Sequence, residues 1–356
     1  MFDKDPHSAL EAMTAAQWLA FAPLAFQAVI SMRDRGVLEA LADAPHGEGC
    51  TLESLASLCG LSIYATRVLL EAGLGLHVTW RREGRWHLSK LGRILLNDEM
   101  TRINMDFTRD VCWGPARHLD AALVEGRPAG LKELGPWQTL YEGLSVLPEP
   151  ARESWHRFDQ YYSDRAFPVA CERLSTRLPE RMLDVGCNTG KWAQTCLAYH
   201  PTLQMGLVDL APQLDRARLR LRTAGLETRA SFHPTNLLEP GSRLPEGYDL
   251  IWMSQFLDCF AEPEILAILS KARAALRPGG RLWILELFWD RQRFEGAAMS
   301  LQQTSLYFTC VANGNSQMYD SEVFMPLLKQ AGFCVDACTD GLGGYHTLIE
   351  CHVSAG

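Results

Sequence analysis

Residues 182–193, MLDVGCNTGKWA, constrain the fold more than any other stretch of the sequence. The apolar pair Met182-Leu183 predicts a strand that reaches Asp184, and a glycine-bearing turn then leads into a helix from about Lys191. This order places backbone N–H groups and a helix N-terminus at the carboxyl end of the strand, which favours a nucleotide-like ligand. The turn, residues 186–190, is neither GxGxxG nor GxxxxGK[ST], which excludes the dinucleotide fingerprint and the P-loop.

Length, composition and charge limit the class of protein. At 356 residues the chain is long enough for two domains, and 47% hydrophobic and 21% charged residues are typical of a soluble globular protein. The net charge of −8 argues against a general nucleic-acid binder. Eleven scattered cysteines without a CxxC pair predict reduced thiols in the cytoplasm, with neither disulfides nor a metal site.

The N-terminal residues predict neither a signal peptide nor a membrane span. Three charged residues at 3–5 precede any apolar run. The apolar stretch 18–32 is interrupted by Pro23 and Gln27, and we expect it to be too short to cross a bilayer.

Residues 1–110 are expected to form a winged-helix domain. Residues 13–42 predict two helices, and residues 51–73 predict a helix pair capped by Thr51 and Ser62. A two-stranded wing is expected around residues 78–88. The domain holds 11 Lys+Arg against 14 Asp+Glu, whereas binding to duplex DNA needs clustered cations. A dimerisation module that pairs with a second copy of the chain is therefore favoured over DNA binding.

Residues 111–180 predict a helical linker. A Gly- and Pro-rich connection, 126–150, precedes a pair of helices over 151–178, and aromatic residues that include Tyr162 gather in the second part. These aromatic side chains lie just before the strand of the glycine turn, so some of them are candidates to line a site.

Residues 181–356 alternate strands with helices, which predicts an α/β domain with a doubly wound parallel sheet. The second strand, residues 203–210, carries Asp209 about twenty residues after the glycine turn. A carboxylate at this point can accept hydrogen bonds from both ribose hydroxyls. An antiparallel hairpin, 333–337 and 345–352, is expected to close the sheet.

Several motifs, in order, resemble those of class I S-adenosylmethionine (SAM) methyltransferases. They are LDVGCNTG, VDL at 208–210, Tyr248-Asp249, RPGGRLWILE at 277–286 and LLKQAGF at 327–333. With the wing domain in front, nearly the whole chain is similar to the small-molecule O-methyltransferases that act on plant phenolics and bacterial polyketides. A looser resemblance, in runs 17–23 and 252–258, is to methyltransferases of aryl-polyene pigments. The resemblance implies a Rossmann-like class I fold with a winged-helix dimerisation domain, SAM as cofactor, a homodimer and a small aromatic acceptor.

The resemblance also implies roles for individual residues. Asp209 would hold the ribose, Leu210 would pack on the adenine, and Asn236 stands where an Asp usually reads the adenine amino group. The implied cofactor contacts are Asp184, Gly186, Asn188, Gly190, Asp209, Leu210, Asn236, Leu237, Met253 and Ser254. The apolar segment 296–311 stands where the family lines its acceptor pocket, and the expected substrate contacts are Tyr162, Phe256, Met299 and Tyr307.

One position departs from the family. The family usually has Leu-His-Asp-Trp after the fourth strand, and its His deprotonates the acceptor, but here Leu257 stands in place of that His. Asp258 and Glu286, which match the neighbouring Asp and the Glu that orients the His, are the predicted catalytic residues, and His346 is a further substitute. In-line positioning contributes ~7 kcal/mol or more and a base only ~10²–10⁴-fold, so loss of the His need not abolish methyl transfer.

Three alternatives to O-methylation remain open at this point. A ring carbon beside a phenolic oxygen is also a nucleophile, so C-methylation of a phenol would not need the His. A protein that binds SAM without transferring its methyl group is the second. A winged-helix transcription regulator is the third, and the acidic first domain disfavours it.

Overall fold

The computed structural model describes residues 2, 4–45 and 47–354, and the chain divides into two compact units. One unit ends at Thr108 and the other begins at Arg109. The first unit contains α1 (Ala9–Asp34), α2 (Val37–Ala42), α3 (Leu52–Leu58), α4 (Ile63–Gly75), β1 (Thr79–Arg82), β2 (Arg85–Leu88), α5 (Lys90–Asn97) and α6 (Glu99–Phe107).

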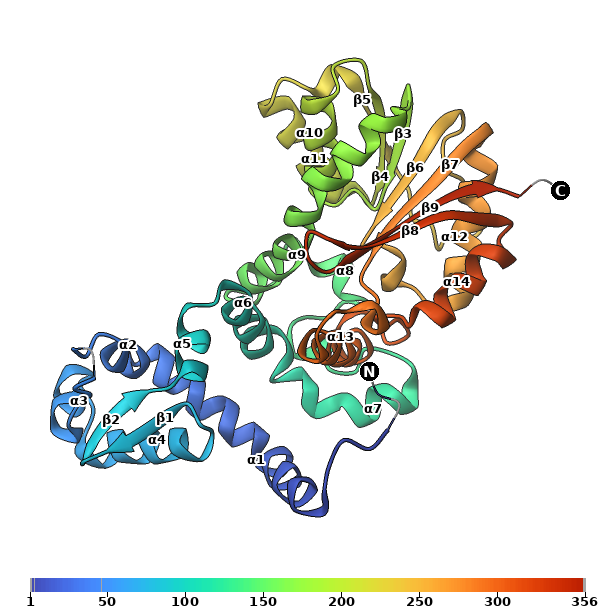
Figure 1. Ribbon diagram of the computed structural model, residues 1–356. Coiled ribbons are helices and arrows are strands. Elements are labelled where there is room, and N and C mark those ends of the chain that lie inside the picture. Colours follow the sequence, from blue (N-terminus) through green and yellow to red (C-terminus); the bar gives the residue numbers. More distant parts are fainter. Residues whose placement is uncertain (1, 3, 46, 355–356) are drawn as a thin grey trace. The chain divides into compact units, whose positions relative to one another are not determined.

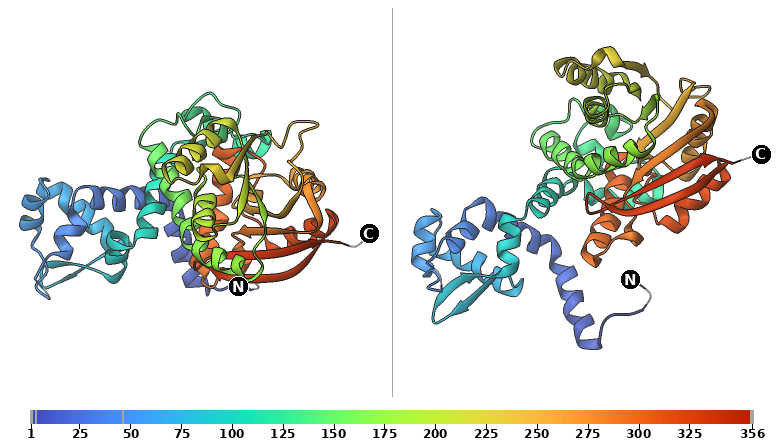
Figure 2. Two further views of the ribbon diagram at one scale, coloured as in Figure 1. Left: turned by 90° about the horizontal axis from the view of Figure 1, so that it is seen from above. Right: turned by 45° about the horizontal axis from the view of Figure 1, so that its top comes forward.

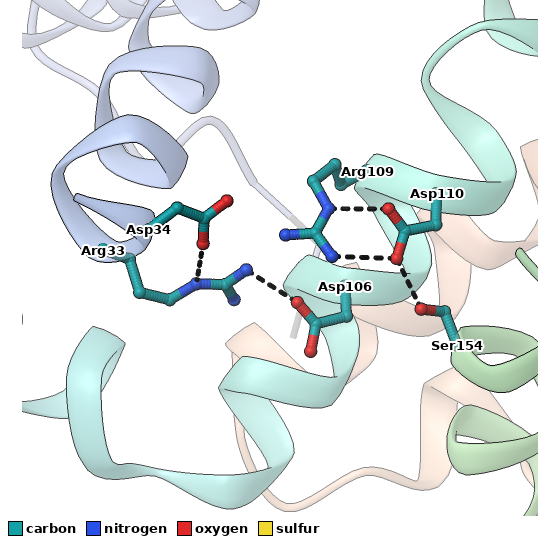
Figure 3. Close-up of polar contacts among 6 residues, drawn as sticks. All are labelled: Arg33, Asp34, Asp106, Arg109, Asp110 and Ser154. Atoms are coloured by element: carbon teal, nitrogen blue, oxygen red, sulfur yellow. Dashed lines mark hydrogen bonds and ion pairs between the residues drawn. The ribbon is translucent and has the colours of Figure 1, made fainter. Parts of the chain in front are cut away.

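The winged-helix pattern expected for the first unit is present (Figure 1). The Thr51 hydroxyl accepts a hydrogen bond from Ser54 N at the start of α3, and Ser62 accepts one from Ala65 N at the start of α4. Strands β1 and β2 form an antiparallel hairpin. The side chain of Arg33 on α1 donates from Nη2 to Oδ1 of Asp106 on α6 at 2.7 Å, which ties the first helix to the last (Figure 3).

Two helices were expected over residues 13–42 and two are present, but α1 corrects one expectation from the sequence. Pro23 lies inside one helix of 26 residues, and the break comes at Gly36, whose φ of 74° is left-handed. By length and composition α1 is long and apolar enough to cross a membrane, so the expectation that the stretch is too short was wrong. The same test is passed by core helices of soluble proteins and by signal sequences, so it is weak evidence for a span.

The second unit contains a seven-stranded sheet. The strands are β3 (Arg181–Val185), β4 (Gln204–Asp209), β5 (Ala230–Pro234), β6 (Tyr248–Ser254), β7 (Leu276–Glu286), β8 (Phe333–Leu342) and β9 (His346–Val353). The helices are α7 (Leu119–Glu125), α8 (Leu140–Gly143), α9 (Ala151–Leu174), α10 (Lys191–Tyr199), α11 (Ala211–Thr223), α12 (Glu262–Ala275), α13 (Glu295–Tyr307) and α14 (Ser321–Gln330).

The strand order β5-β4-β3-β6-β7-β9-β8 confirms the predicted doubly wound α/β sheet. The first five strands run parallel, and the β8–β9 hairpin adds antiparallel to β7. The chain moves outward from β3 through β4 to β5 and then returns to place β6 on the other side of β3. The switch point therefore lies between β3 and β6, where ligands bind at the carboxyl ends of the strands.

Alternating side chains give each face of the sheet its own helices (Figures 1 and 2). Leu183, Ile251 and Met253 pack with α12 and α14 on one face. Met182 and Trp252 pack with α9, α10 and α11 on the other.

Helix α9 is one helix where the sequence predicted a pair. Pro168 lies inside it, and its buried side chains from Ala166 to Leu174 continue to pack on the sheet beyond the proline. Near its start, the Ser154 hydroxyl donates to Oδ2 of Asp110 at 2.5 Å, and Arg109 donates to both oxygens of the same carboxylate (Figure 3). These contacts anchor the first turn of α9 to residues 109 and 110.

Candidate active site

The glycine turn after β3 has left-handed backbone at three positions. The φ angles are 76° at Gly186, 47° at Asn188 and 73° at Gly190. A Cβ at Gly186 would lie 2.2 Å from Cδ2 of Phe256, and one at Gly190 would lie 2.8 Å from Cβ of Ala217. Glycine is required at both positions, whereas asparagine tolerates the left-handed conformation at 188.

Asn188 joins the turn to two carboxylates. Its backbone N–H donates to Oδ2 of Asp209 at 2.8 Å, and its Nδ2 donates to Oδ2 of Asp159 on α9 at 2.9 Å. The other oxygen of Asp209 accepts from Leu210 N at 2.7 Å. Burial raises the pKa of Asp209 to about 6, although both hydrogen bonds act to lower it.

A cavity of about 320 Å³ opens at the carboxyl ends of β3, β4 and β6. One side holds four of the predicted cofactor contacts, Asp209, Leu210, Asn236 and Leu237. The Oδ1 atom of Asn236 accepts from Leu238 N at 3.0 Å, which leaves this oxygen one more lone pair. Four aromatic residues from α8, α9 and the loop after β6 form the aromatic wall of this cavity: Tyr141, Trp155, Phe256 and Phe260.

A smaller cavity of about 70 Å³ lies beneath the glycine turn. Its lining includes Asp184, Trp192, Trp252 and Ser254, and the two indole rings stack 4.0 Å apart. Each of these four side chains has a buried polar atom with no hydrogen-bond partner in the described part of the chain: Asp184 Oδ2, Trp192 Nε1, Trp252 Nε1 and Ser254 Oγ. Because buried polar groups are normally paired, this cavity is built for a polar ligand group.

The two cavities fit the two ends of SAM. The large cavity offers a carboxylate and apolar side chains suited to a nucleoside, and the small one offers unpaired donors and an acceptor suited to an amino acid. Four residues line both cavities: Asp159, Gly186, Asn188 and Gln255.

Two domain families match this chain. The family described as a methyltransferase domain matches residues 183–282, and a Dimerisation2-like domain matches residues 13–86. The first match covers the glycine turn, Asp209 and strands β4 to β6. The chain is a SAM-dependent methyltransferase with a dimerisation domain in front. SAM is the cofactor of this family, and the dimerisation domain supports self-association.

Curated relatives and solved structures match most of this methyltransferase. The L-tyrosine C(3)-methyltransferase of Streptomyces lavendulae is 23% identical over 90% of the chain and 87% of the relative. The demethylspheroidene O-methyltransferase of Rhodobacter capsulatus is 26% identical over 86% of the chain and 73% of the relative. The crystal structure of the SAM-dependent methyltransferase SibL shares the fold, with a TM-score of 0.72, 23% identity and coverage of 96% and 99% of the two chains.

In this methyltransferase, Leu257 and Asp258 lie outside the lining of the large cavity. Leu257 is fully buried, and the residues on either side of it differ in placement: Phe256 lines the cavity, whereas Asp258 is buried outside the lining. Glu286 accepts hydrogen bonds at Oε1 from Phe256 N at 3.0 Å and Leu257 N at 2.9 Å. Burial and the nearby Asp258 carboxylate raise the pKa of Glu286 well above its usual range, against the lowering effect of its backbone hydrogen bonds.

His346 is also buried away from the lining. Its Nε2 lies 3.1 Å from Oε1 of Gln255, one of the four residues shared by the two cavities. Burial lowers the pKa of His346 to about 4, so the ring is neutral and positions the Gln255 amide. Among the described residues, the lining of the two cavities includes no histidine.

The expected substrate contacts lie in different places. Phe256 lines the large cavity, and Tyr307 is buried behind it, where its hydroxyl accepts from Nε1 of the lining residue Trp155 at 2.7 Å. Tyr162 packs against Tyr345, and Met299 is about half exposed. Met253, expected beside the cofactor, is fully buried in the core between the sheet and α12.

Several lining residues were not predicted from the sequence, among them Tyr141, Trp155, Asp159 and Gln255. On α9 a usable signal existed, because Trp155, Asp159, Ser163 and Phe167 recur every four residues and so share one face of a helix. Tyr141 and Gln255 have no comparable pattern around them.

Proposed function

We propose that this enzyme transfers the methyl group of SAM to a hydroxyl of a small aromatic acceptor. The single observation that carries the proposal is the junction of the two cavities, which is bounded by Asp159, Gly186, Asn188 and Gln255 and opens onto an aromatic wall. A donor that fills both cavities would expose its methyl group toward that wall.

The donor would be held by the predicted cofactor contacts. Asp209 would accept the ribose hydroxyls, Leu210 and Leu237 would pack on the adenine, and Asn236 would accept from its amino group. The unpaired atoms of Asp184 and Ser254 would bind the amino-acid end. Gly186 and Gly190 would keep the turn close to the ligand because neither position has room for a Cβ.

The acceptor class follows from the wall of the large cavity. Tyr141, Trp155, Phe256 and Phe260 present aromatic surface from two sides of the cavity, which suits a flat ring. Asn313 and Asn315 also line the cavity and can hydrogen-bond a polar substituent. The relatives named for L-tyrosine and for demethylspheroidene act on organic molecules of small size, in agreement with this class.

SAM supplies an electrophilic methyl group. The protein positions the acceptor, excludes water from the site and supplies charged groups. The aromatic wall excludes water and holds the acceptor oxygen in line with the methyl carbon, an arrangement worth ~7 kcal/mol or more of the barrier. Glu286, bonded to two backbone N–H groups, fixes the loop that carries Phe256. Asp258 is held by the Cys259 thiol at 3.4 Å and adds negative charge behind the wall.

The remaining features of the chain fit this role. We propose three functional parts: residues 1–110 form a homodimer, residues 111–180 supply helices on the acceptor side, and residues 181–356 hold SAM. Apolar side chains exposed on α1, among them Trp18, Leu19 and Leu24, support the dimer. All eleven cysteines are free, which supports a cytoplasmic enzyme.

C-methylation of a phenolic ring is the second candidate. The observation that favours it is Leu257, an apolar residue where the family's His deprotonates the hydroxyl, together with the likeness to a relative named as a C(3)-methyltransferase. A ring carbon can attack the methyl group without a base on the hydroxyl itself.

Incubation with ¹³C-methyl SAM and a panel of phenols tests the proposal. The expected product shows a labelled methoxy carbon in its NMR spectrum, and a labelled aryl-methyl carbon would favour C-methylation instead. Label that stays on SAM, while calorimetry shows that SAM binds, would point to the non-methylating alternative.

A further inference from the structure

Asp159 is the one residue with an ionisable side chain among the four described residues that line both cavities. The other three are Gly186, Asn188 and Gln255, none of which can take up a proton at ordinary pH. SAM joins its nucleoside to its amino-acid chain through the sulfonium. If the nucleoside occupies the large cavity and the amino acid the small one, the sulfonium must lie at these shared residues.

The side chain of Asp159 is held in place from two directions. It projects from the face of α9 that also carries Trp155 one turn earlier and Ser163 one turn later, and all three line the cavities. Its Oδ2 accepts from Nδ2 of Asn188 at 2.9 Å. Oδ2 is thus oriented by the glycine turn, and the carboxyl group borders the space where donor and acceptor would meet.

The charged groups around Asp159 are mostly negative. Asp258 approaches from the turn after β6, Asp164 lies one turn further along α9 and is paired with Lys191, and the Tyr307 hydroxyl lies nearby on α13. Burial, followed by Asp258 and Asp164, raises the pKa of Asp159 to about 7, against the lowering effect of the Asn188 bond. A group of this pKa can both accept and release a proton near neutral pH.

We propose that Asp159 is the general base that replaces the missing histidine, and this assignment rests on the proposed function. The acceptor hydroxyl would give its proton to a carboxylate oxygen of Asp159 as the hydroxyl oxygen bonds to the methyl carbon. The bond from that carbon to sulfur breaks, and its electron pair stays on sulfur, which leaves S-adenosylhomocysteine.

The charge balance of the buried site supports this assignment. Before transfer, the sulfonium is positive and the Asp159 carboxylate negative, so the junction is neutral. After transfer the thioether, the methyl ether and the protonated Asp159 are all uncharged, so the junction is neutral again. Among the described residues, neither Glu286 nor His346 lines either cavity, and His346 is bonded to Gln255, so neither borders the junction as Asp159 does.

Binding of SAM and of S-adenosylhomocysteine at different pH values tests the assignment without an acceptor. The two ligands differ in charge only at sulfur, so only SAM should favour the ionised form of Asp159. Between pH 6 and pH 8 we expect the affinity for SAM, relative to S-adenosylhomocysteine, to rise about tenfold in the natural protein. In the Asp159→Asn variant this relative change should vanish, while the amide oxygen keeps the bond from Asn188.

The other outcomes of this titration overturn the proposal. If Asp159→Asn lowers the affinity for both ligands by the same factor, the carboxylate binds the amino group that both ligands share and does not lie at the sulfonium. If the tenfold relative change persists in Asp159→Asn, another group carries it. Glu153→Gln, an exposed change on the same helix, is the matched control and should behave like the natural protein.

Methyl transfer gives the second readout. Asp159→Asn should lower kcat by about 10²-fold or more and remove the fall of kcat/KM below pH 7, whereas Glu153→Gln should do neither. Full activity in Asp159→Asn would overturn the proposal. If the natural protein shows the relative change in SAM affinity but methylates no acceptor, Asp159 lies at the sulfonium as inferred and it is the proposed function that fails.

Discussion

The Nδ2 atom of Asn188 lies 2.9 Å from Oδ2 of Asp159, so the residue at the middle of the glycine turn is hydrogen-bonded to a carboxylate on α9. A glycine at this position would have no side chain to make such a bond. Asn188 therefore links the part of the chain that would hold the donor to the helix that faces the acceptor.

Replacing Asn188 with glycine should change the pH dependence of the enzyme more than its fold. Glycine adopts the φ of 47° without strain, so the turn should persist. The bond from Asn188 lowers the pKa of Asp159, and its loss should move the acid limb of kcat/KM upward by up to about one pH unit. An acid limb at the same pH in Asn188→Gly, with normal SAM affinity, would separate Asp159 from the proton transfer.

Gly186 and Gly225 form a matched pair for the glycine turn. Their φ angles are 76° and 71°, but a Cβ at Gly186 meets the ring of Phe256 whereas a Cβ at Gly225 meets nothing within 4 Å. Gly225→Ala should therefore cost about 1–2 kcal/mol of unfolding free energy from the backbone alone. Gly186→Ala should cost more and should also abolish SAM binding, as urea unfolding and calorimetry would measure. Equal losses in the two variants would mean that Phe256 yields to the new methyl group.

Asp209→Asn tests the ribose contact. Asparagine keeps one acceptor oxygen but loses the charge, so the Kd for SAM should rise about 10–100-fold. In the natural protein, affinity for both SAM and S-adenosylhomocysteine should fall as the pH drops through about 6, because protonation removes an acceptor. Asp215→Asn, an exposed change on α11, should leave Kd unchanged. An unchanged Kd in Asp209→Asn would show that the ribose does not bind at Asp209.

Glu286→Gln separates a role in positioning from a role as base. The folded-state pKa of Glu286 is raised, so the natural protein should lose stability as the pH rises above about 4.5, while the glutamine variant should not. The gap in unfolding free energy between the two should therefore grow in favour of Glu286→Gln from pH 5 to pH 8. Activity should stay within about threefold, because the glutamine amide oxygen can still accept the bonds from the backbone N–H groups of Phe256 and Leu257. A loss of about 10²-fold would instead make Glu286 the base, as the sequence suggested.

The fold could be predicted from the sequence because the local patterns of strands, turns and caps agree with the order of the elements along the chain. The pattern of residues 182–190 predicts the strand and its glycine turn. Thr51 and Ser62 cap the helices that they were expected to cap. The length of α1 was misjudged because Pro23 was taken as a break. Helix α9 was predicted as a pair of helices, yet it continues through Pro168, where its buried far half packs on the sheet.

The site was only partly accessible. The glycine turn and Asp209 follow the backbone order of the sheet, which the sequence records. To predict Asp159 as a site residue, one must know which face of α9 meets the cavity. The four-residue spacing identifies that face only when Trp155 and Phe167 are recognised as residues of the same face. Tyr162, three positions further along, was favoured because it is aromatic, yet the structure packs it against Tyr345.

A crystal structure of the complex with S-adenosylhomocysteine tests the central claim most directly. We predict ribose hydroxyls on Asp209, the amino-acid end beside Asp184 and Ser254, and the sulfur between Asp159 and Gln255 facing the aromatic wall. A ligand seated outside the two cavities, or a sulfur turned away from Asp159 and from Trp155, would contradict both the methyl-transfer site and the role of Asp159.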